Sequence, residues 1–258
     1  MPDPSNKDLH DAALEISAAA AAVPMQYFRS AIAVEDKPDE TPVTIADRET
    51  ETHIRRAIET RFPSHAILGE EFGKNDKAGD HTWVVDPIDG TRSFICGFPL
   101  FGMLVGVLNG DEPVAGVIRM PALAEVFSGF RGGGAMKDGA PISCRKDVRI
   151  KEARIVINEA NRMMMNEPLR LRKLMSVGQI RRFFNDCYPF ALLSMGQLDV
   201  VIDSDLQPYD YLPIVPVVEA AGGVMTDWHG GKLGLGSDGS VIAAATPELH
   251  REIMNRLR

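Results

Sequence analysis

The first half of the chain alternates apolar runs with short polar turns, a pattern typical of an antiparallel β-sheet. Residues 101–108 and 114–120 are apolar and are separated by the tetrapeptide Asn109-Gly110-Asp111-Glu112. Because Asn-Gly favours a tight turn, the two runs are predicted to form a β-hairpin. Residues 125–130 extend this meander to a turn at the three glycines 132–134. No Lys-Ser or Lys-Thr pair follows those glycines, so a turn is predicted there and not a phosphate-binding loop.

Two helices are predicted before this sheet. Residues 8–33 are rich in alanine and predict one long helix that Pro24 kinks. Residues 47–60 place apolar side chains at helical spacing and predict a second helix. Asp47 stands at the start of this second pattern, so an N-cap is one interpretation of that residue.

From about residue 150 the pattern changes to strands that alternate with helices. The segments predicted as strands are 153–157, 179–182, 198–202, 224–228 and 241–245. Those predicted as helices are 167–175, 186–195, 210–221 and a terminal helix that begins at Pro247. We therefore expect an α/β protein in two lobes, an α+β lobe at 1–150 and an α/β lobe at 151–258, with a cleft between them.

The stretch 82–91 carries the most distinctive chemistry. An apolar run at 82–85 predicts a buried strand, and Asp86 and Asp89 follow it on a turn that contains Pro87. The next residues, Gly90-Thr91, predict a helix start whose free N–H groups favour an anion. Two carboxylates beside an anion site repel that anion unless cations lie between them. The pattern thus indicates hard divalent metal ions that bridge the protein and a phosphate group.

Composition narrows the class of protein. The chain has 258 residues, 25% of them charged and 45% hydrophobic, which is ordinary for a globular protein. A formal net charge of −8 argues against a nucleic-acid partner. The cysteines, Cys96, Cys144 and Cys187, form no CxxC pair and the histidines no HExxH motif, so a zinc site is not expected. The sequence shows neither a signal peptide nor an apolar run of membrane-spanning length, so we expect a cytoplasmic protein without membrane contact.

Five short motifs, in order along nearly the whole chain, resemble the metal-dependent phosphatase superfamily of inositol monophosphatase and fructose-1,6-bisphosphatase. They are Thr44-Ile45-Ala46-Asp47, Gly69-Glu70-Glu71, Asp86-Pro87-Ile88-Asp89-Gly90-Thr91, Tyr209-Asp210 and Glu219-Ala220-Ala221-Gly222-Gly223. The resemblance implies a layered αβαβα sandwich, a homodimer and a phosphomonoesterase that acts on a small phosphorylated metabolite. It also implies two or three Mg²⁺ ions per subunit, with Mn²⁺ as an alternative.

The resemblance also assigns roles to residues. It places one metal ion on Glu70, Asp86 and the Ile88 carbonyl, and a second on Asp86, Asp89 and Asp210. Glu70 would orient and deprotonate the water that attacks phosphorus in line, with support from Thr91 and Asp47. The N–H groups of Gly90 and Thr91 would hold phosphate oxygens. A lysine at the mouth of the family's site could correspond to Lys37, although an ordinary surface lysine is the simpler interpretation.

Three segments resemble the histidinol-phosphate phosphatase branch of that superfamily. They are Arg92-Ser93-Phe94, Gln207-Pro208-Tyr209-Asp210-Tyr211 and Asp186-Cys187-Tyr188. The branch has two glycines before the last of these, where this chain has Phe184 and Asn185. Asp186 would bind the amine or imidazole of histidinol phosphate, and helix N-capping is a compatible interpretation.

Substrate selection would thus involve four residues, namely Asp89, Arg92, Asp186 and Asp203. Asp203 stands where inositol enzymes use a glutamate for a substrate hydroxyl. The leading hypothesis is a histidinol-phosphate phosphatase of histidine biosynthesis. An inositol-1-phosphate or broad-specificity monophosphatase is the alternative enzyme. A regulatory protein of the same fold that works through protein contacts is the alternative from another class.

Overall fold

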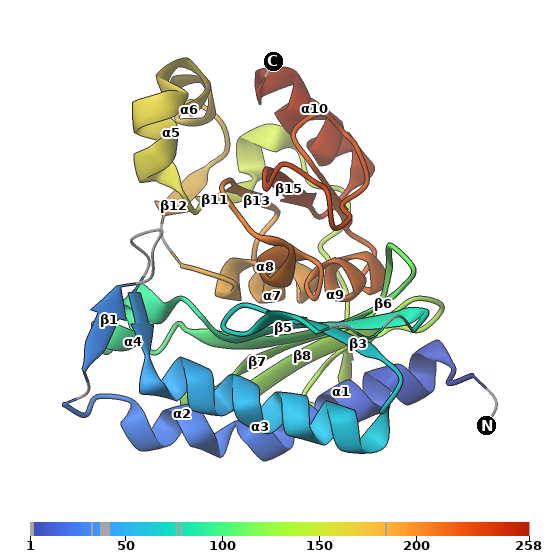
Figure 1. The fold of residues 1–258 in the computed structure, drawn as a ribbon. Coiled ribbons are helices and arrows are strands. Elements are labelled where there is room, and N and C mark those ends of the chain that lie inside the picture. Colours follow the sequence, from blue (N-terminus) through green and yellow to red (C-terminus); the bar gives the residue numbers. More distant parts are fainter. Residues whose placement is uncertain are drawn as a thin grey trace.

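The computed structural model describes residues 3–31, 33–36, 42–75, 77, 79–183 and 185–257. Three layers of helices alternate with two β-sheets, so the chain forms a five-layered αβαβα sandwich (Figure 1). The predicted α/β class and layer order are confirmed. Lys37 and Phe184 lie outside the described residues.

The first helical layer contains α1 (Asn6–Ala20), α2 (Ala22–Tyr27) and α3 (Ile45–Arg61). The single helix predicted for 8–33 was wrong, because the chain breaks at Ala21 and the helical part stops at Tyr27. Pro24 has no N–H to donate to the Ala20 carbonyl, so the helix ends one turn before the proline. The second helix starts two residues earlier than predicted, with Thr44 as its N-cap.

The first sheet has eight strands in the order β10-β9-β8-β7-β6-β5-β3-β4 among the described residues. All neighbours pair antiparallel except β3 and β5. Its strands are β3 (Ala66–Gly69), β4 (Gly73–Lys74), β5 (His81–Asp89), β6 (Gly102–Asn109), β7 (Glu112–Met120), β8 (Glu125–Phe130), β9 (Ala135–Lys137) and β10 (Ala140–Ile142). The β6–β7 hairpin and the glycine turn after β8 are confirmed.

Short elements join these layers. A two-stranded sheet, β1 (Val34–Asp36) and β2 (Pro42–Thr44), precedes α3. The one-and-a-half-turn helix α4 (Thr91–Ile95) follows β5 directly. Two 3₁₀ turns, Pro121–Leu123 and Ile150–Glu152, connect β7 to β8 and lead into the second half.

The middle layer contains α7 (Tyr188–Ser194), α8 (Pro208–Tyr211) and α9 (Val215–Ala220) between the two sheets (Figure 1). One helix had been predicted for 210–221, but Pro213 and Pro216 lack the N–H donors that a continuous helix needs there. The helices pack closely on the first sheet. A Cβ at Gly116 of β7 would lie 1.9 Å from the Pro213 carbonyl oxygen, so only glycine allows this approach.

The second sheet has the order β12-β11-β13-β15-β14. Its strands are β11 (Arg154–Ile157), β12 (Ile180–Phe183), β13 (Val200–Asp203), β14 (Val224–Thr226) and β15 (Val241–Ala244), and the outer helices are α5 (Ala160–Asn166), α6 (Pro168–Leu174) and α10 (Pro247–Leu257). Strand β11 runs parallel to both β12 and β13. These three strands therefore end at one edge of the sheet, facing the first sheet. Helix α5 was not predicted.

One apolar core joins the two sheets. It includes Leu104 and Ile118 of the first sheet, Val217 of α9 and Val201 of the second sheet, all fully or almost fully buried. The division into lobes at residue 150 stays a prediction. Within the part of the chain that the structure describes, every helix is too short or too polar to cross a membrane.

Candidate active site

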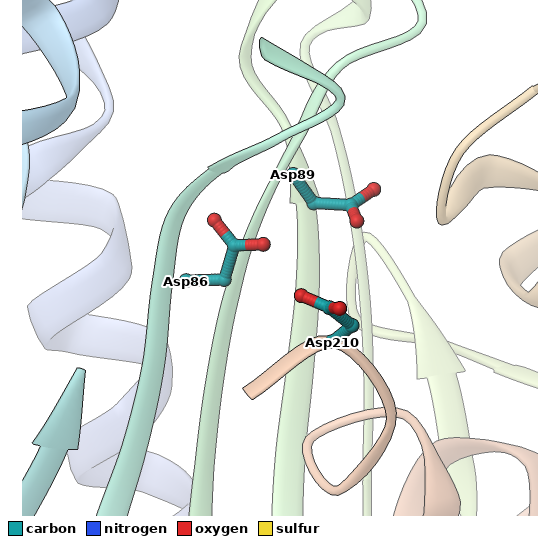
Figure 2. A group of neighbouring side chains, drawn as sticks. All are labelled: Asp86, Asp89 and Asp210. Carbon is teal, nitrogen blue, oxygen red and sulfur yellow. The ribbon is translucent and has the colours of Figure 1, made fainter. Parts of the chain in front are cut away.

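Three aspartates from distant parts of the chain meet between the sheets. Asp86 and Asp89 lie at the end of β5, and Asp210 lies in the first turn of α8 (Figure 2). One carboxylate oxygen of each residue lies within 4.8 Å of those of the other two. The sequence had placed the first two on a turn, but both remain in β5. Pro87 cannot donate to the ladder, and a bulge between Asp86 and Asp89 turns the two carboxylates to the same side.

Backbone N–H groups hold each of these carboxylates in place. Asp86 Oδ1 accepts from the Ile88 N–H at 3.0 Å, and Asp210 Oδ2 accepts from the Gln207 N–H at 2.7 Å. Asp89 Oδ2 accepts from the Cys187 N–H at 2.6 Å. The cluster is therefore pre-oriented, and each carboxylate keeps its remaining oxygen lone pairs for another ligand.

The carboxylates repel one another strongly. Burial, and then the charges of Glu70, Asp89 and Asp210, raise the pKa of Asp86 well above its usual value. Burial and the neighbouring Asp186 raise the pKa of Asp89 to about 7. Burial and Asp89 also raise the pKa of Asp210 well above the usual range.

Such a cluster is stable only when protons or cations offset its charge. The donors are carboxylate oxygens, a set that suits a hard divalent cation such as Mg²⁺. The residues present therefore fit the metal that the sequence predicted.

Glu70 is brought to this cluster by the turn between β3 and β4. Its N–H donates to the Val85 carbonyl at 3.1 Å. Glu51 of α3, fully buried, accepts from the N–H groups of Glu71 at 2.7 Å and Phe72 at 3.3 Å. Glu51 was missed by the sequence reasoning, although it lies one helical turn after Asp47 and so shares its face.

Asp47 and Thr91 join α3 to the first turn of α4. Asp47 Oδ2 accepts from the Thr44 N–H at 2.8 Å and its hydroxyl at 2.6 Å, which closes a capping box. Asp47 is therefore the third residue of the helix and not its N-cap. Its other oxygen lies 3.2 Å from the Thr91 hydroxyl, which is also 3.2 Å from the Ile88 carbonyl. Thr91 is thus held between helix α3 and strand β5.

The turn at Gly90 is shaped by a residue from the other half of the chain. Gly90 has a φ of +85° and begins α4. A Cβ there would lie 2.7 Å from Asp186 Cγ, so glycine is needed for both conformation and space. Asp186 Oδ2 accepts from the Ser93 hydroxyl at 2.6 Å.

Asp186 does not cap a helix, as one interpretation had it. It has a φ of +48°, and the N-cap of α7 is Cys187. Burial raises the pKa of the Asp186 carboxyl. Asn185, which departs from the histidinol branch, turns its side-chain amide back to the Phe183 carbonyl at 2.9 Å.

A cavity of about 550 Å³ lies next to the aspartates. All the residues predicted to select the substrate, Asp89, Arg92, Asp186 and Asp203, line it. Asp203 is 5% exposed, and burial raises its pKa to about 8. Two further lining residues, Asn158 and Glu159, were missed by the sequence reasoning. The polar pair that follows the apolar strand at 153–157 was the available signal.

Comparisons with known proteins find relatives over nearly the whole chain. The sequence profile of the inositol monophosphatase family matches residues 5–258. The chain is 36% identical over 241 residues to the bifunctional phosphatase IMPL2, chloroplastic, of Arabidopsis thaliana, over 90% of this chain and 70% of that protein. It is 34% identical over 235 residues to a histidinol-phosphatase of Chlorobaculum parvum, over 90% of each. The solved structure of an inositol monophosphatase from Zymomonas mobilis superposes with a TM-score of 0.89 at 31% identity, over 99% of both chains.

Proposed function

The chain belongs to the inositol monophosphatase family and is a phosphomonoesterase, and on this premise we propose that its substrate is histidinol phosphate. Members of the family are metal-dependent phosphatases that generally use Mg²⁺. The substrate assignment depends on the part of the cavity wall that carries Asp186.

The proposed metal-binding groups are the carboxylates of Glu70, Asp86, Asp89 and Asp210 and the Ile88 carbonyl. Bound Mg²⁺ supplies positive charge that offsets the buried carboxylates, polarises the phosphate group and makes water more acidic. The N–H groups that hold Asp86, Asp89 and Asp210 fix the directions of these oxygens before any ion arrives.

The other groups of the site would orient the attacking water and the phosphate, and one of them would accept a proton. Glu70 lies beside Asp86 and would accept the proton of the attacking water. Asp47 holds the Thr91 hydroxyl toward the Ile88 carbonyl, so Thr91 can position that water for in-line attack. The N–H groups of Gly90 and Thr91, at the start of α4, would donate to the phosphate oxygens as negative charge develops.

The observation that carries the choice of substrate is the position of Asp186. Its carboxylate lines the cavity directly beside Gly90, where the phosphate would bind. A carboxylate this close to the phosphate opposes a substrate whose alcohol is neutral. It favours one whose amine or imidazole brings a compensating positive charge. Carboxylates also outnumber the two arginines, Arg92 and Arg162, in the lining.

An inositol-1-phosphate or broad-specificity phosphatase is the second candidate. The full-length likeness to the Zymomonas mobilis inositol monophosphatase favours it. Asp203 also lies in the wall, where a carboxylate could accept from a substrate hydroxyl.

Phosphate release from histidinol phosphate, inositol 1-phosphate and an adenosine bisphosphate, measured in parallel with millimolar Mg²⁺, tests the proposal. We expect the highest kcat/KM for histidinol phosphate. In Asp186→Asn this value should fall about tenfold or more, because a charge-assisted contact to the cation is lost. The value for inositol 1-phosphate should stay the same or rise. A wild type that hydrolyses inositol 1-phosphate far better than histidinol phosphate would show that the substrate assignment is wrong.

A further inference from the structure

The cavity wall is built at the ends of three parallel strands. Ile157 of β11 pairs with Phe183 of β12 on one side and with Ile202 of β13 on the other. The residues that follow these strands therefore emerge side by side at one edge of the sheet, the usual place for a ligand site in parallel sheets. Asn158 follows the central strand, Asp203 ends one neighbour, and the segment with Asn185 and Asp186 follows the other.

Asn158 connects all three strand ends through its side chain. It is 6% exposed, and its Nδ2 donates to the Asp203 carboxylate at 2.8 Å and to the Asp186 carbonyl at 2.8 Å. Its Oδ1 accepts from the Asn185 N–H at 3.2 Å. Both partners of the nitrogen are acceptors and the partner of the oxygen is a donor, so the amide fits in this orientation alone.

These bonds help to hold two wall residues, Asp186 and Asp203, in position. Asp186 has a left-handed backbone, which is unfavourable for a non-glycine residue. The bond from Asn158 to its carbonyl opposes relaxation of this turn. Asp203 is held at both oxygens, because its Oδ1 accepts from the Ser204 N–H at 2.9 Å while Oδ2 accepts from Asn158.

We propose that Asn158 is the positioning residue that sets substrate selectivity, because it fixes Asp186 and Asp203 as one wall of carboxyl groups against the alcohol part of the ester. This inference rests on the proposed phosphatase function and deepens it. Asn158 would act through these two carboxylates and leave the metal-binding groups on β5 and α8 in place.

Steady-state kinetics on histidinol phosphate and inositol 1-phosphate, with saturating Mg²⁺, test the inference. In Asn158→Ala we expect the KM for the preferred ester to rise about tenfold while kcat stays within about threefold. The preference, measured as the ratio of the two kcat/KM values, should fall about tenfold. Asn158→Asp keeps the acceptor for the Asn185 N–H and loses both donated bonds, so it should move the ratio in the same direction and provides a nearly isosteric second variant.

Asn166→Ala, an exposed asparagine at the end of α5, is the matched control and should leave both esters unchanged. An unchanged ratio in a folded Asn158 variant, or equal losses for the two esters, overturns the inference. If the wild-type protein prefers inositol 1-phosphate, only the histidinol assignment is wrong. The change of that preference in the Asn158 variants still decides the role of Asn158. A wild type without preference overturns both.

Discussion

Asp89 illustrates how a single buried carboxylate can destabilise the fold that holds it. It accepts a hydrogen bond from the Cys187 N–H, yet Asp186 and the other cluster carboxylates surround it. A pKa near 7 means that the folded state disfavours the charged form that the unfolded chain adopts freely at neutral pH. In the absence of cations, the negative charge of Asp89 therefore destabilises the fold.

We predict that Asp89→Asn abolishes Mg²⁺-dependent turnover and stabilises the metal-free protein. The asparagine oxygen can still accept from Cys187, while the repulsion disappears. Urea unfolding in EDTA at pH 7.5 should show a free energy of unfolding about 1–2 kcal/mol above wild type. Asp111→Asn, an exposed change in the β6–β7 turn, is the control. A variant that is less stable than wild type in EDTA would mean that Asp89 is mainly structural.

At the scale of elements, α3 and the β3–β4 turn act as one unit. Arg55 Nε donates to the buried Glu51 at 2.6 Å, and its guanidinium also donates to the Gly73 carbonyl. A Cβ at Gly69 would lie 2.1 Å from Glu51 Oε1, so the turn packs directly on this carboxylate. The helix thereby sets where Glu70 points.

We predict that Glu51→Gln lowers kcat about tenfold and changes KM less than threefold. The new amide places N–H groups against Arg55 or against the N–H donors of the turn, so Glu70 loses its position. Thermal unfolding should show a loss of roughly 1–3 kcal/mol, the cost of leaving a buried donor without its acceptor. Glu59→Gln, on the exposed side of the same helix, should behave as wild type. Normal kcat in a folded Glu51→Gln protein would contradict a role of Glu51 in positioning Glu70.

Elements that follow local patterns were predictable from the sequence. The alternation of apolar and polar residues and the Asn109-Gly110 pair determine the β6–β7 hairpin, and the strands of the second half were found to within a few residues. The helix breaks at Ala21 and at Pro213 were missed, although Pro24, Pro213 and Pro216 were the available local signals.

The candidate site was predictable where motifs carry it and was not predictable where distant segments meet. The cluster of Asp86, Asp89 and Asp210 was expected from the resemblance and is brought together by the fold. The positive φ of Asp186 depends on Gly90 and Asn158, which lie far from it along the chain. No local pattern around Asp186 contains that information, and so a helix cap looked equally suitable.

At the scale of the whole molecule, the aspartate cluster joins the two halves of the chain. Asp86 and Asp89 belong to the first sheet, whereas Asp210 belongs to the helical layer that also packs on the second. A cation held by all three would therefore stabilise the folded chain as a whole. The homodimer and the cytoplasmic location stay predictions.

We predict that Mg²⁺ raises the Tm of wild type by a few degrees at a concentration about tenfold above its Kd. The linkage corresponds to about 1.4 kcal/mol. Differential scanning calorimetry should show most of this shift missing in Asp210→Asn and retained in Asp111→Asn. An equal shift in all three proteins would place the stabilising ion elsewhere.

The edge at which β11, β12 and β13 end has a consequence for how substrate specificity can evolve in a protein of this fold. In the proposed function, residues at these strand ends would contact the alcohol, while those on β5, α4 and α8 would contact the phosphate and the ions. After gene duplication, substitutions confined to the first group could give one copy a new metabolite without altering the hydrolysis itself. Related proteins with this fold can thus acquire new substrates while they keep the same hydrolysis reaction.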